Sequence, residues 1–156
     1  MKFVFKAYNP QFPTLFIHEK DRIAKHLKMP CIIEHVGSTA VPGLGGKGII
    51  DIAIAADRSS FSSLITEFQH LGYEYFPKYS TLDRHFFKNL PFHLHLTYLE
   101  NKEWADFLKF RDYLRAHPEA RDEYADLKKR AALEANHEGA KYREIKAHIF
   151  SKFTSN

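Results

Sequence analysis

A glycine-dense loop in the first third of the chain is built from residue types that favour close contact between a ligand and the backbone. It runs from Gly37-Ser38-Thr39 through Ala40-Val41-Pro42-Gly43-Leu44-Gly45-Gly46 to Lys47. Glycine permits positive φ angles and close approach of a ligand, although glycine-rich turns also serve chain geometry alone. We favour a ligand loop. His35, just before it, is a candidate proton carrier or phosphate contact, or a side chain that anchors the loop.

Two histidines and an aspartate have the spacing of a metal site. His93 and His95 are two residues apart, so on a strand both side chains face the same side of the sheet. If Asp51 lies opposite, the three form a two-histidine, one-carboxylate cluster, which suits Mn, Fe or Zn better than Mg. In the alternative interpretation the histidines are only hydrogen-bonded, or they donate to a phosphate.

Two arginines have both a ligand-binding and a structural interpretation. Arg84 begins an expected strand, where its guanidinium can hold a phosphate through two hydrogen bonds or pair with a surface carboxylate. Arg111 lies on an apolar helical stripe, so we expect it to be paired, either with Asp112 or with a ligand phosphate. For Arg111 we slightly favour the structural role.

Two tyrosine and lysine pairs have the spacing of neighbours on one helical face. Tyr124 with Lys128, and Tyr142 with Lys146, are each four residues apart. Their lysines can reach phosphates, or they can cover apolar surface with their aliphatic stems. The sequence favours neither interpretation.

Length and composition predict one soluble domain. The chain has 156 residues, 44% of them hydrophobic, and its single cysteine, Cys31, cannot form an internal disulfide. The net charge of +4 favours anionic partners such as nucleotides or phosphorylated small molecules. No basic tract or nucleic-acid motif is present, so nucleic acid is disfavoured. Because no segment resembles a signal peptide or a membrane span, we expect a cytoplasmic protein.

The apolar pattern predicts an α+β fold with a mixed β-sheet, in one domain over residues 1–156. We expect a core over about residues 1–100 and C-terminal helices over about residues 102–153. The expected strands are residues 31–36, 48–55, 73–76, 85–88 and 92–98, the last two forming a hairpin through Asn89-Leu90-Pro91. The expected helices are residues 12–28, 61–71, 102–116, a segment after His117-Pro118 towards Glu138, and about 141–153.

The longest motif of the chain resembles a known signature. The stretch Glu34-His35-Val36-Gly37-Ser38-Thr39-Ala40-Val41-Pro42-Gly43-Leu44, followed by Lys47 and Ile49-Ile50-Asp51-Ile52, closely resembles that of the GrpB family of predicted nucleotidyltransferases. The resemblance covers almost the whole chain. Its further matches are Arg84, the His93/His95 strand, Phe110-Arg111-Asp112-Tyr113-Leu114-Arg115-Ala116-His117-Pro118, Tyr124 with Lys128, and Tyr142 with Lys146.

The resemblance implies a nucleotidyltransferase-like core of the DNA polymerase β type, flanked by helices. In that layout the amides of the Gly37-Ser38-Thr39 turn and the Ser38 hydroxyl hold the phosphate tail of a nucleotide, and Lys47 adds a positive charge. Asp51 is implied as a ligand of a divalent metal such as Mg, Mn or Zn, which aligns and neutralises the phosphates. In the alternative interpretation Ser38 and Thr39 cap a short helix and Lys47 is solvated.

The sequence departs from the superfamily pattern at two places. Active members carry an Asp-x-Asp or Asp-x-Glu pair on the second strand, whereas here Ala53 takes the place of the second carboxylate. A third carboxylate is expected on a neighbouring strand, where this chain has His93-Leu94-His95 and no acidic residue before Glu100. The carboxylate set for two-metal catalysis is therefore incomplete.

Three functional hypotheses follow. The first is transfer of a nucleoside monophosphate from a nucleoside triphosphate to an unknown acceptor, with Asp51, His35 and Lys47 as catalytic residues and with Arg84 and Arg111 among the phosphate contacts. The second is a non-catalytic module that binds a nucleotide or a ligand of the coenzyme A type, because family members occur fused to dephospho-coenzyme A kinase. The third is a histidine-based, metal-dependent phosphoesterase that uses Asp51, His93 and His95.

Overall fold

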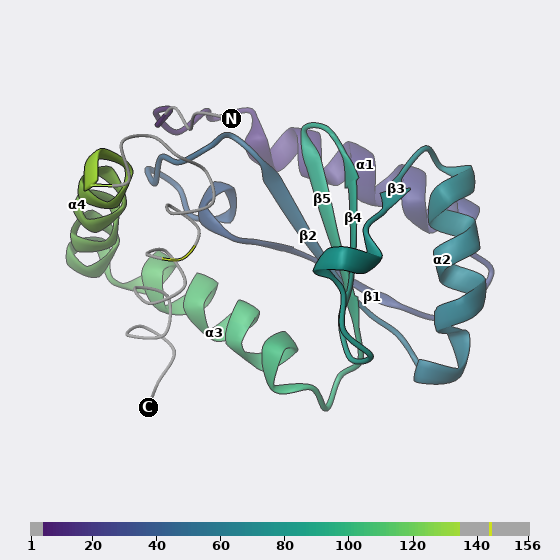
Figure 1. Ribbon diagram of the computed structural model, residues 1–156. Helices are drawn as coiled ribbons and strands as arrows, with labels where there is room; N and C mark the ends of the chain where they lie inside the picture. Colours follow the sequence, from purple (N-terminus) through teal and green to yellow (C-terminus); the bar gives the residue numbers. More distant parts are fainter. Residues whose placement is uncertain (1–4, 135–143, 145–156) are drawn as a thin grey trace.

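The computed structural model describes residues 5–134 and Glu144. Figure 1 shows two helices among the strands of the first part of the chain and two consecutive helices after the last strand. The helices are α1 (Phe12–His26), α2 (Phe61–His70), α3 (Lys102–Ala116) and α4 (Pro118–Glu134), with short 3-10 turns at Ser38–Ala40, Arg58–Ser60 and Pro77–Tyr79. The strands are β1 (Ile32–Val36), β2 (Ile50–Ala55), β3 (Glu74–Tyr75), β4 (His85–Asn89) and β5 (Phe92–Thr97).

The five described strands form one mixed sheet in the order β1-β2-β5-β4-β3. β2 and β5 run parallel, and the other neighbouring strands are antiparallel. This confirms the predicted mixed α+β architecture and the hairpin between β4 and β5. β1 is an edge strand, so one side of its backbone has no strand beside it.

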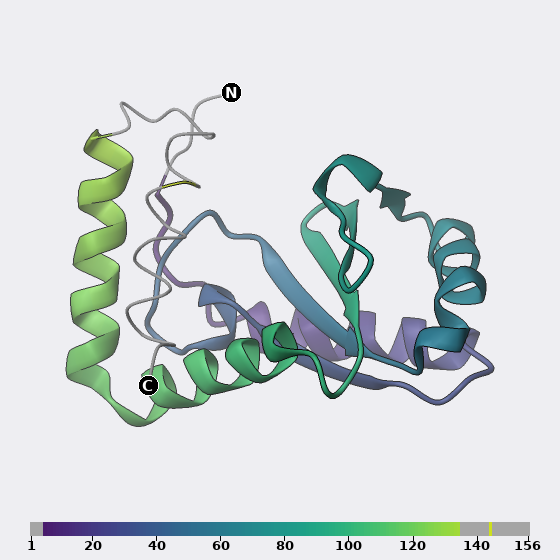
Figure 2. The same ribbon diagram turned by 60° about the horizontal axis from the view of Figure 1, so that its bottom comes forward.

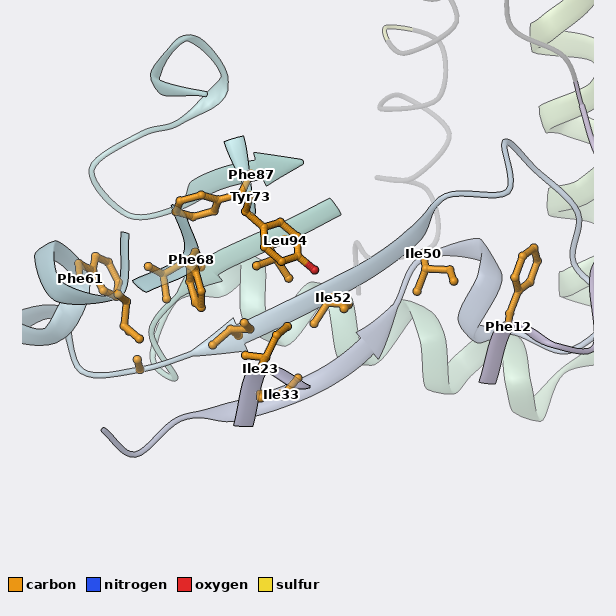
Figure 3. Packing of buried hydrophobic residues seen from close by; sticks show 14 residues of the cluster. Phe12, Ile23, Ile33, Ile50, Ile52, Phe61, Phe68, Tyr73, Phe87 and Leu94 are labelled. Atoms are coloured by element: carbon orange, nitrogen blue, oxygen red, sulfur yellow. The ribbon is translucent and has the colours of Figure 1, made fainter. Parts of the chain in front are cut away.

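One face of the sheet carries the main hydrophobic core. Ile50, Ile52 and Ile54 alternate along β2, and all three are fully buried. They pack with Leu94 of β5 and with apolar side chains of α1 and α2, among them Ile23. Figure 3 shows this cluster beside the strands. The isoleucine spacing seen in the sequence is therefore the spacing of a strand with one apolar face against two helices.

The opposite face of the sheet is covered in part by α3. Trp104 packs on Val36, Ala53 and Ala55, which alternate with the core-facing residues of β1 and β2. Helix α4 stands at the end of the molecule away from α2 in both views (Figures 1 and 2). Its Tyr124 joins a second cluster with side chains of α3 and of the glycine-dense loop, namely Val41, Leu44, Phe110 and Leu114.

The observed boundaries differ from the expected ones in a few places. β2 begins at Ile50 and not at residue 48, because Gly48 has a φ of 77°, which a strand does not allow. α3 spans residues 102–116, as predicted. The expected extension of α4 to residue 138 and, apart from Glu144, the expected helix over residues 141–153 lie outside the described residues. No described helix is long and apolar enough to cross a membrane.

Candidate functional site

Parallel pairing of β2 with β5 brings the predicted aspartate and histidines together. The register places Asp51 beside His93, and Ala53 beside His95, so Asp51 and both histidines lie on the same face of the sheet. Asp51 Oδ1 lies 3.1 Å from His95 Nε2 and 3.8 Å from His93 Nδ1. This face is the one that α3 covers only in part, and all three side chains keep some exposure to solvent.

Arg84 determines which nitrogen of His95 carries the proton. Its Nη1 lies 3.2 Å from His95 Nδ1. A guanidinium has only donors, so Nδ1 must be the acceptor and His95 donates its proton from Nε2 to Asp51 Oδ1. Arg84 is itself held by α3, because its Nε lies 2.5 Å from Glu103 Oε2. Arg84 therefore acts on Asp51 through His95.

His93 is a neutral imidazole at neutral pH. Burial lowers its pKa from 6.5 to about 4, against the opposing effect of Asp51, and the positive charges of Lys88 and Lys47 lower it further. Neutral imidazole is the form that ligates metals or accepts a hydrogen bond. Lys88 is also the register partner of His93 in β4. The sequence did not single out Lys88, because only the strand register shows that it belongs to this face.

The donor atoms at Asp51 resemble those of a metal site in chemistry but are not closed around one point. Among the described residues, the group of three whose donor atoms all lie within 4.8 Å of one another is His26, Glu67 and His70. Asp51 and His93 offer a carboxylate and a neutral imidazole, a set that fits Mn or Zn. The His95 nitrogen that faces Asp51 carries a proton in this arrangement, so His95 would ligate a metal only after exchanging that proton.

The Gly-Ser turn lies directly against Asp51. Gly37 has a φ of 76°, and a Cβ atom built at this position would lie 2.5 Å from Asp51 Oδ2. Any side chain there would collide with the carboxylate, so only glycine fits. The backbone of the Gly37-Ser38-Thr39 turn therefore lies against the Asp51 carboxylate.

Ser38 and a buried lysine of α4 lie against the next part of the loop. A Cβ atom at Gly46 would lie 2.8 Å from Ser38 Oγ and 2.7 Å from Lys128 Nζ, so both groups reach this glycine. Lys128 is only 1% exposed, and its Nζ donates to the Gly45 carbonyl over 3.3 Å. The Tyr124 and Lys128 spacing was the sequence signal for this lysine, and the structure places it inside the protein, under the loop.

Two residues of the same motif point to the other side of the sheet. His35 is the register partner of Ile52, stacks on Phe16 of α1 and is buried. Its Nε2 hydrogen-bonds with the hydroxyl of Thr39, which is also buried. Burial lowers the pKa of His35 to about 4. The structure therefore places His35 and Thr39 on the α1 side of the sheet, where they anchor the loop, and Asp51 on the opposite face, from which its charge partly offsets the effect of burial on His35.

Arg111 joins α3 to the edge strand β1 through ion pairs and a hydrogen bond. Its Nη1 lies 2.8 Å from Glu34 Oε2, and its Nε lies 2.8 Å from Asp112 Oδ1. Nη1 also donates to the carbonyl of His35, which covers a backbone acceptor of the edge strand. These contacts favour the structural role that the sequence suggested for Arg111.

Comparisons with known proteins agree on one family. The family model described as "GrpB protein" matches residues 2–156. The chain is 33% identical to UPF0157 protein BH1888 of Halalkalibacterium halodurans, over 91% of this chain and 75% of that protein. It is 36% identical to UPF0157 protein PA4798 of Pseudomonas aeruginosa, over 77% of this chain but only 53% of that protein.

A solved structure gives the same assignment. The crystal structure of the conserved protein GrpB from Enterococcus faecalis aligns with a TM-score of 0.80 and 29% sequence identity. The alignment covers 96% of this chain and 99% of the other. Agreement over both sequence and fold extends across nearly the full length of the two chains. The chain belongs to the GrpB family.

Proposed function

We propose that the face around Asp51 is a nucleotide site and that the chain is a metal-assisted nucleotidyltransferase. The observation that carries the proposal is the position of Asp51, which lies between the Gly37 turn and the two histidines of β5. A carboxylate beside a glycine turn is the arrangement that a nucleotidyltransferase-like core needs to bind a phosphate tail. The nucleotide donates its nucleoside monophosphate to an acceptor and releases pyrophosphate.

In this proposal each residue of the face has its own role. Asp51 and His93 would hold a divalent metal, which supplies positive charge to the phosphates. The backbone of Gly37 and the hydroxyl of Ser38 would contact phosphate oxygens, and Lys47 adds charge near His93. His95 is a positioning residue, because it accepts from Arg84 and donates to Asp51. This donation orients the Asp51 carboxylate.

A second candidate function is binding without transfer. Ala53 occupies the place of the second carboxylate, is fully buried and packs under Trp104. A second metal ligand is therefore replaced by apolar packing at this position. This observation favours a module that binds a nucleotide or a ligand of the coenzyme A type through the same turn and lysines, with no chemical step.

A thermal-shift experiment separates the two candidates. Nucleoside triphosphates and coenzyme A are each tested with Mg, Mn, Zn or chelator on the wild type, on Asp51→Asn, and on Asp21→Asn, whose carboxylate is exposed on α1. A ligand at about 100 times its Kd stabilises the folded state by about 2.7 kcal/mol, which raises Tm by roughly 5 to 10 °C for a chain of this size.

Each candidate function predicts a different outcome. Transfer predicts metal-dependent stabilisation by nucleotide that is lost in Asp51→Asn, kept in Asp21→Asn, and accompanied by pyrophosphate release. Stabilisation that depends on neither metal nor Asp51 supports the binding module. Release of inorganic phosphate from a phosphoester, dependent on Asp51 and His93, would instead identify a phosphoesterase. If no nucleotide or coenzyme A ligand stabilises the wild type, both candidates are wrong.

A further inference from the structure

A concave site away from Asp51 lies on the far side of strand β1. It is a cavity of about 580 Å³ at the exposed edge of β1, between the first turns of α1 and the second half of α3. Cavities of this volume accommodate small molecules. The residues that matter for its chemistry are Tyr8, Phe16, His35, Arg111, Arg115 and Arg121.

Three arginines give the cavity a positive wall, and two of them already have carboxylate partners. Arg111 is paired with Glu34 and Asp112. Arg121 is paired with Asp122, over 3.1 Å. His35 adds no charge at neutral pH, since burial lowers its pKa to about 4. Arg115, the third arginine, makes no direct ion pair with a carboxylate of the described residues, although Asp112 and Glu34 lie close enough to act on its charge.

Arg115 is held by one hydrogen bond, which uses its Nε and not its two terminal nitrogens. Its Nε donates to the carbonyl of Ala40 over 2.8 Å, which fixes the plane of the guanidinium. Neither terminal nitrogen has a hydrogen-bond or ion-pair partner within the part of the chain that the structure describes. Burial lowers the pKa of Arg115, and the positive charge of Arg111 lowers it further, against the opposing effect of Asp112 and Glu34. An anion placed here would relieve that repulsion and satisfy two parallel donors.

Apart from Glu34, which is paired with Arg111, the rest of the cavity wall is apolar or aromatic. Phe16, Pro13 and Pro42 line it together with the ring of Tyr8. A charged wall next to an aromatic wall suits a molecule with one anionic head and one flat or aliphatic body. Inorganic phosphate alone would fill only a small part of the cavity volume.

We propose that this cavity binds a small organic anion, with its carboxylate or phosphate head on the terminal nitrogens of Arg115 and its apolar body against Tyr8 and Phe16. The site is separate from the nucleotide site proposed above, because the cavity lies along the exposed edge of β1, whereas Asp51 lies in β2 on the other side of that strand. It would therefore keep its ligand in a chain whose Asp51 site is disabled.

The test is a set of NMR titrations of the ¹⁵N-labelled chain with four probes. Phenyl phosphate and benzoate carry both a head and a body, inorganic phosphate has only the head, and benzyl alcohol has only the body. The variants are Arg115→Gln, Arg115→Lys, Asp51→Asn and, as a charge-matched control, Arg130→Gln, an exposed arginine of α4. Backbone spectra of each variant show whether its fold is intact.

We expect saturable shifts around His35 and Ala40 with at least one of the aromatic anions, and the tighter of the two identifies the preferred head. Binding should weaken about tenfold or more in Arg115→Gln, recover in part in Arg115→Lys, and change less than about twofold in Asp51→Asn and Arg130→Gln. Inorganic phosphate and benzyl alcohol should bind at least about tenfold more weakly. The proposal is wrong if neither aromatic anion saturates, if folded Arg115→Gln binds as the wild type does, or if the shifts centre on Asp51.

Discussion

Asp51 owes its orientation to two neighbours that have no negative charge. On one side Gly37 brings its backbone against the carboxylate, and on the other the Nε2 proton of His95 is directed at Oδ1 because Arg84 occupies Nδ1. A carboxylate held in this way needs no second carboxylate to fix its rotamer. This explains how Ala53 can pack under Trp104 without disordering the site.

Gly37 can be tested directly. Its φ of 76° and ψ of −172° are open essentially to glycine alone, and an added Cβ would lie 2.5 Å from Asp51 Oδ2. We expect Gly37→Ala to lower the free energy of unfolding by about 2 to 4 kcal/mol, from backbone strain and the steric collision. Urea denaturation measures the change.

A second glycine separates these two contributions. Gly48 also has a positive φ, of 77°, but its nearest neighbour is the flexible Lys6 side chain at 3.4 Å. Gly48→Ala should therefore lower the free energy of unfolding by only about 1 kcal/mol, from backbone strain alone. In an Asp51→Ala background the effect of Gly37→Ala should shrink by about 1 kcal/mol or more. Equal effects in both backgrounds would show that the carboxylate does not restrict Gly37.

His35 makes folding sensitive to acid. Its pKa falls from 6.5 to about 4 on folding, chiefly through burial, so below pH 6.5 the unfolded chain binds a proton that the folded chain does not. Stability should be unaffected above pH 7 and should fall as the pH drops from 6.5 towards 4, by up to about 3 kcal/mol for this group. His93, whose pKa is also lowered to about 4, adds to the same loss.

The contribution of His35 is measured by unfolding curves at pH 7 and pH 4.5. In His35→Gln the difference in stability between the two pH values should shrink by about 1 to 3 kcal/mol, because the ionisable group is gone. His18→Gln, which removes a histidine exposed on α1, should leave the difference close to that of the wild type. An unchanged pH dependence in His35→Gln would mean that His35 has the same pKa in the folded and the unfolded chain, so that burial does not hinder its protonation at pH 4.5.

At the scale of elements, periodicity was a reliable guide wherever one face of an element is buried. The isoleucines at alternate positions of β2 and the apolar stripe of α2 both predicted elements that the structure contains. Boundaries were less predictable where a single backbone angle decides them. Gly48 delays the start of β2, whereas Gly72, with a φ of 99°, follows α2 as a glycine stop signal should.

The candidate site was only partly predictable for a different reason. Spacing shows that His93 and His95 share a face of the sheet, but it cannot show which residues of β1 lie on that same face. That choice follows from strand pairing, which matches Val36 with Asp51 and leaves His35 on the side of α1. The role of Arg84 depends equally on α3, because Glu103 and His95 hold it from two elements that are remote in sequence from β2.

At the scale of the whole molecule, three clusters of buried side chains are linked through the sheet and the glycine-dense loop. The main core lies under α1 and α2, a smaller cluster under α3, and a third joins α3, α4 and the loop. Val41 and Leu44 of the loop are buried in the third cluster, so α4 supports the segment that carries Lys47. Loss of α4 packing should therefore destabilise the loop and, through it, the sheet.

This arrangement predicts that the chain unfolds as one unit, in agreement with the single domain expected from its length. Leu94 lies in the main core, Leu114 lies in the third cluster, and each is 1% exposed or less. We expect Leu94→Ala and Leu114→Ala each to lower the free energy of unfolding by about 2 to 5 kcal/mol. In each variant, fluorescence of Trp104, the only tryptophan, and far-UV circular dichroism should report the same urea midpoint. If Leu114→Ala shifted the midpoint of one probe and not the other, α4 with its part of α3 would unfold separately from the sheet, and the single-domain prediction would be wrong.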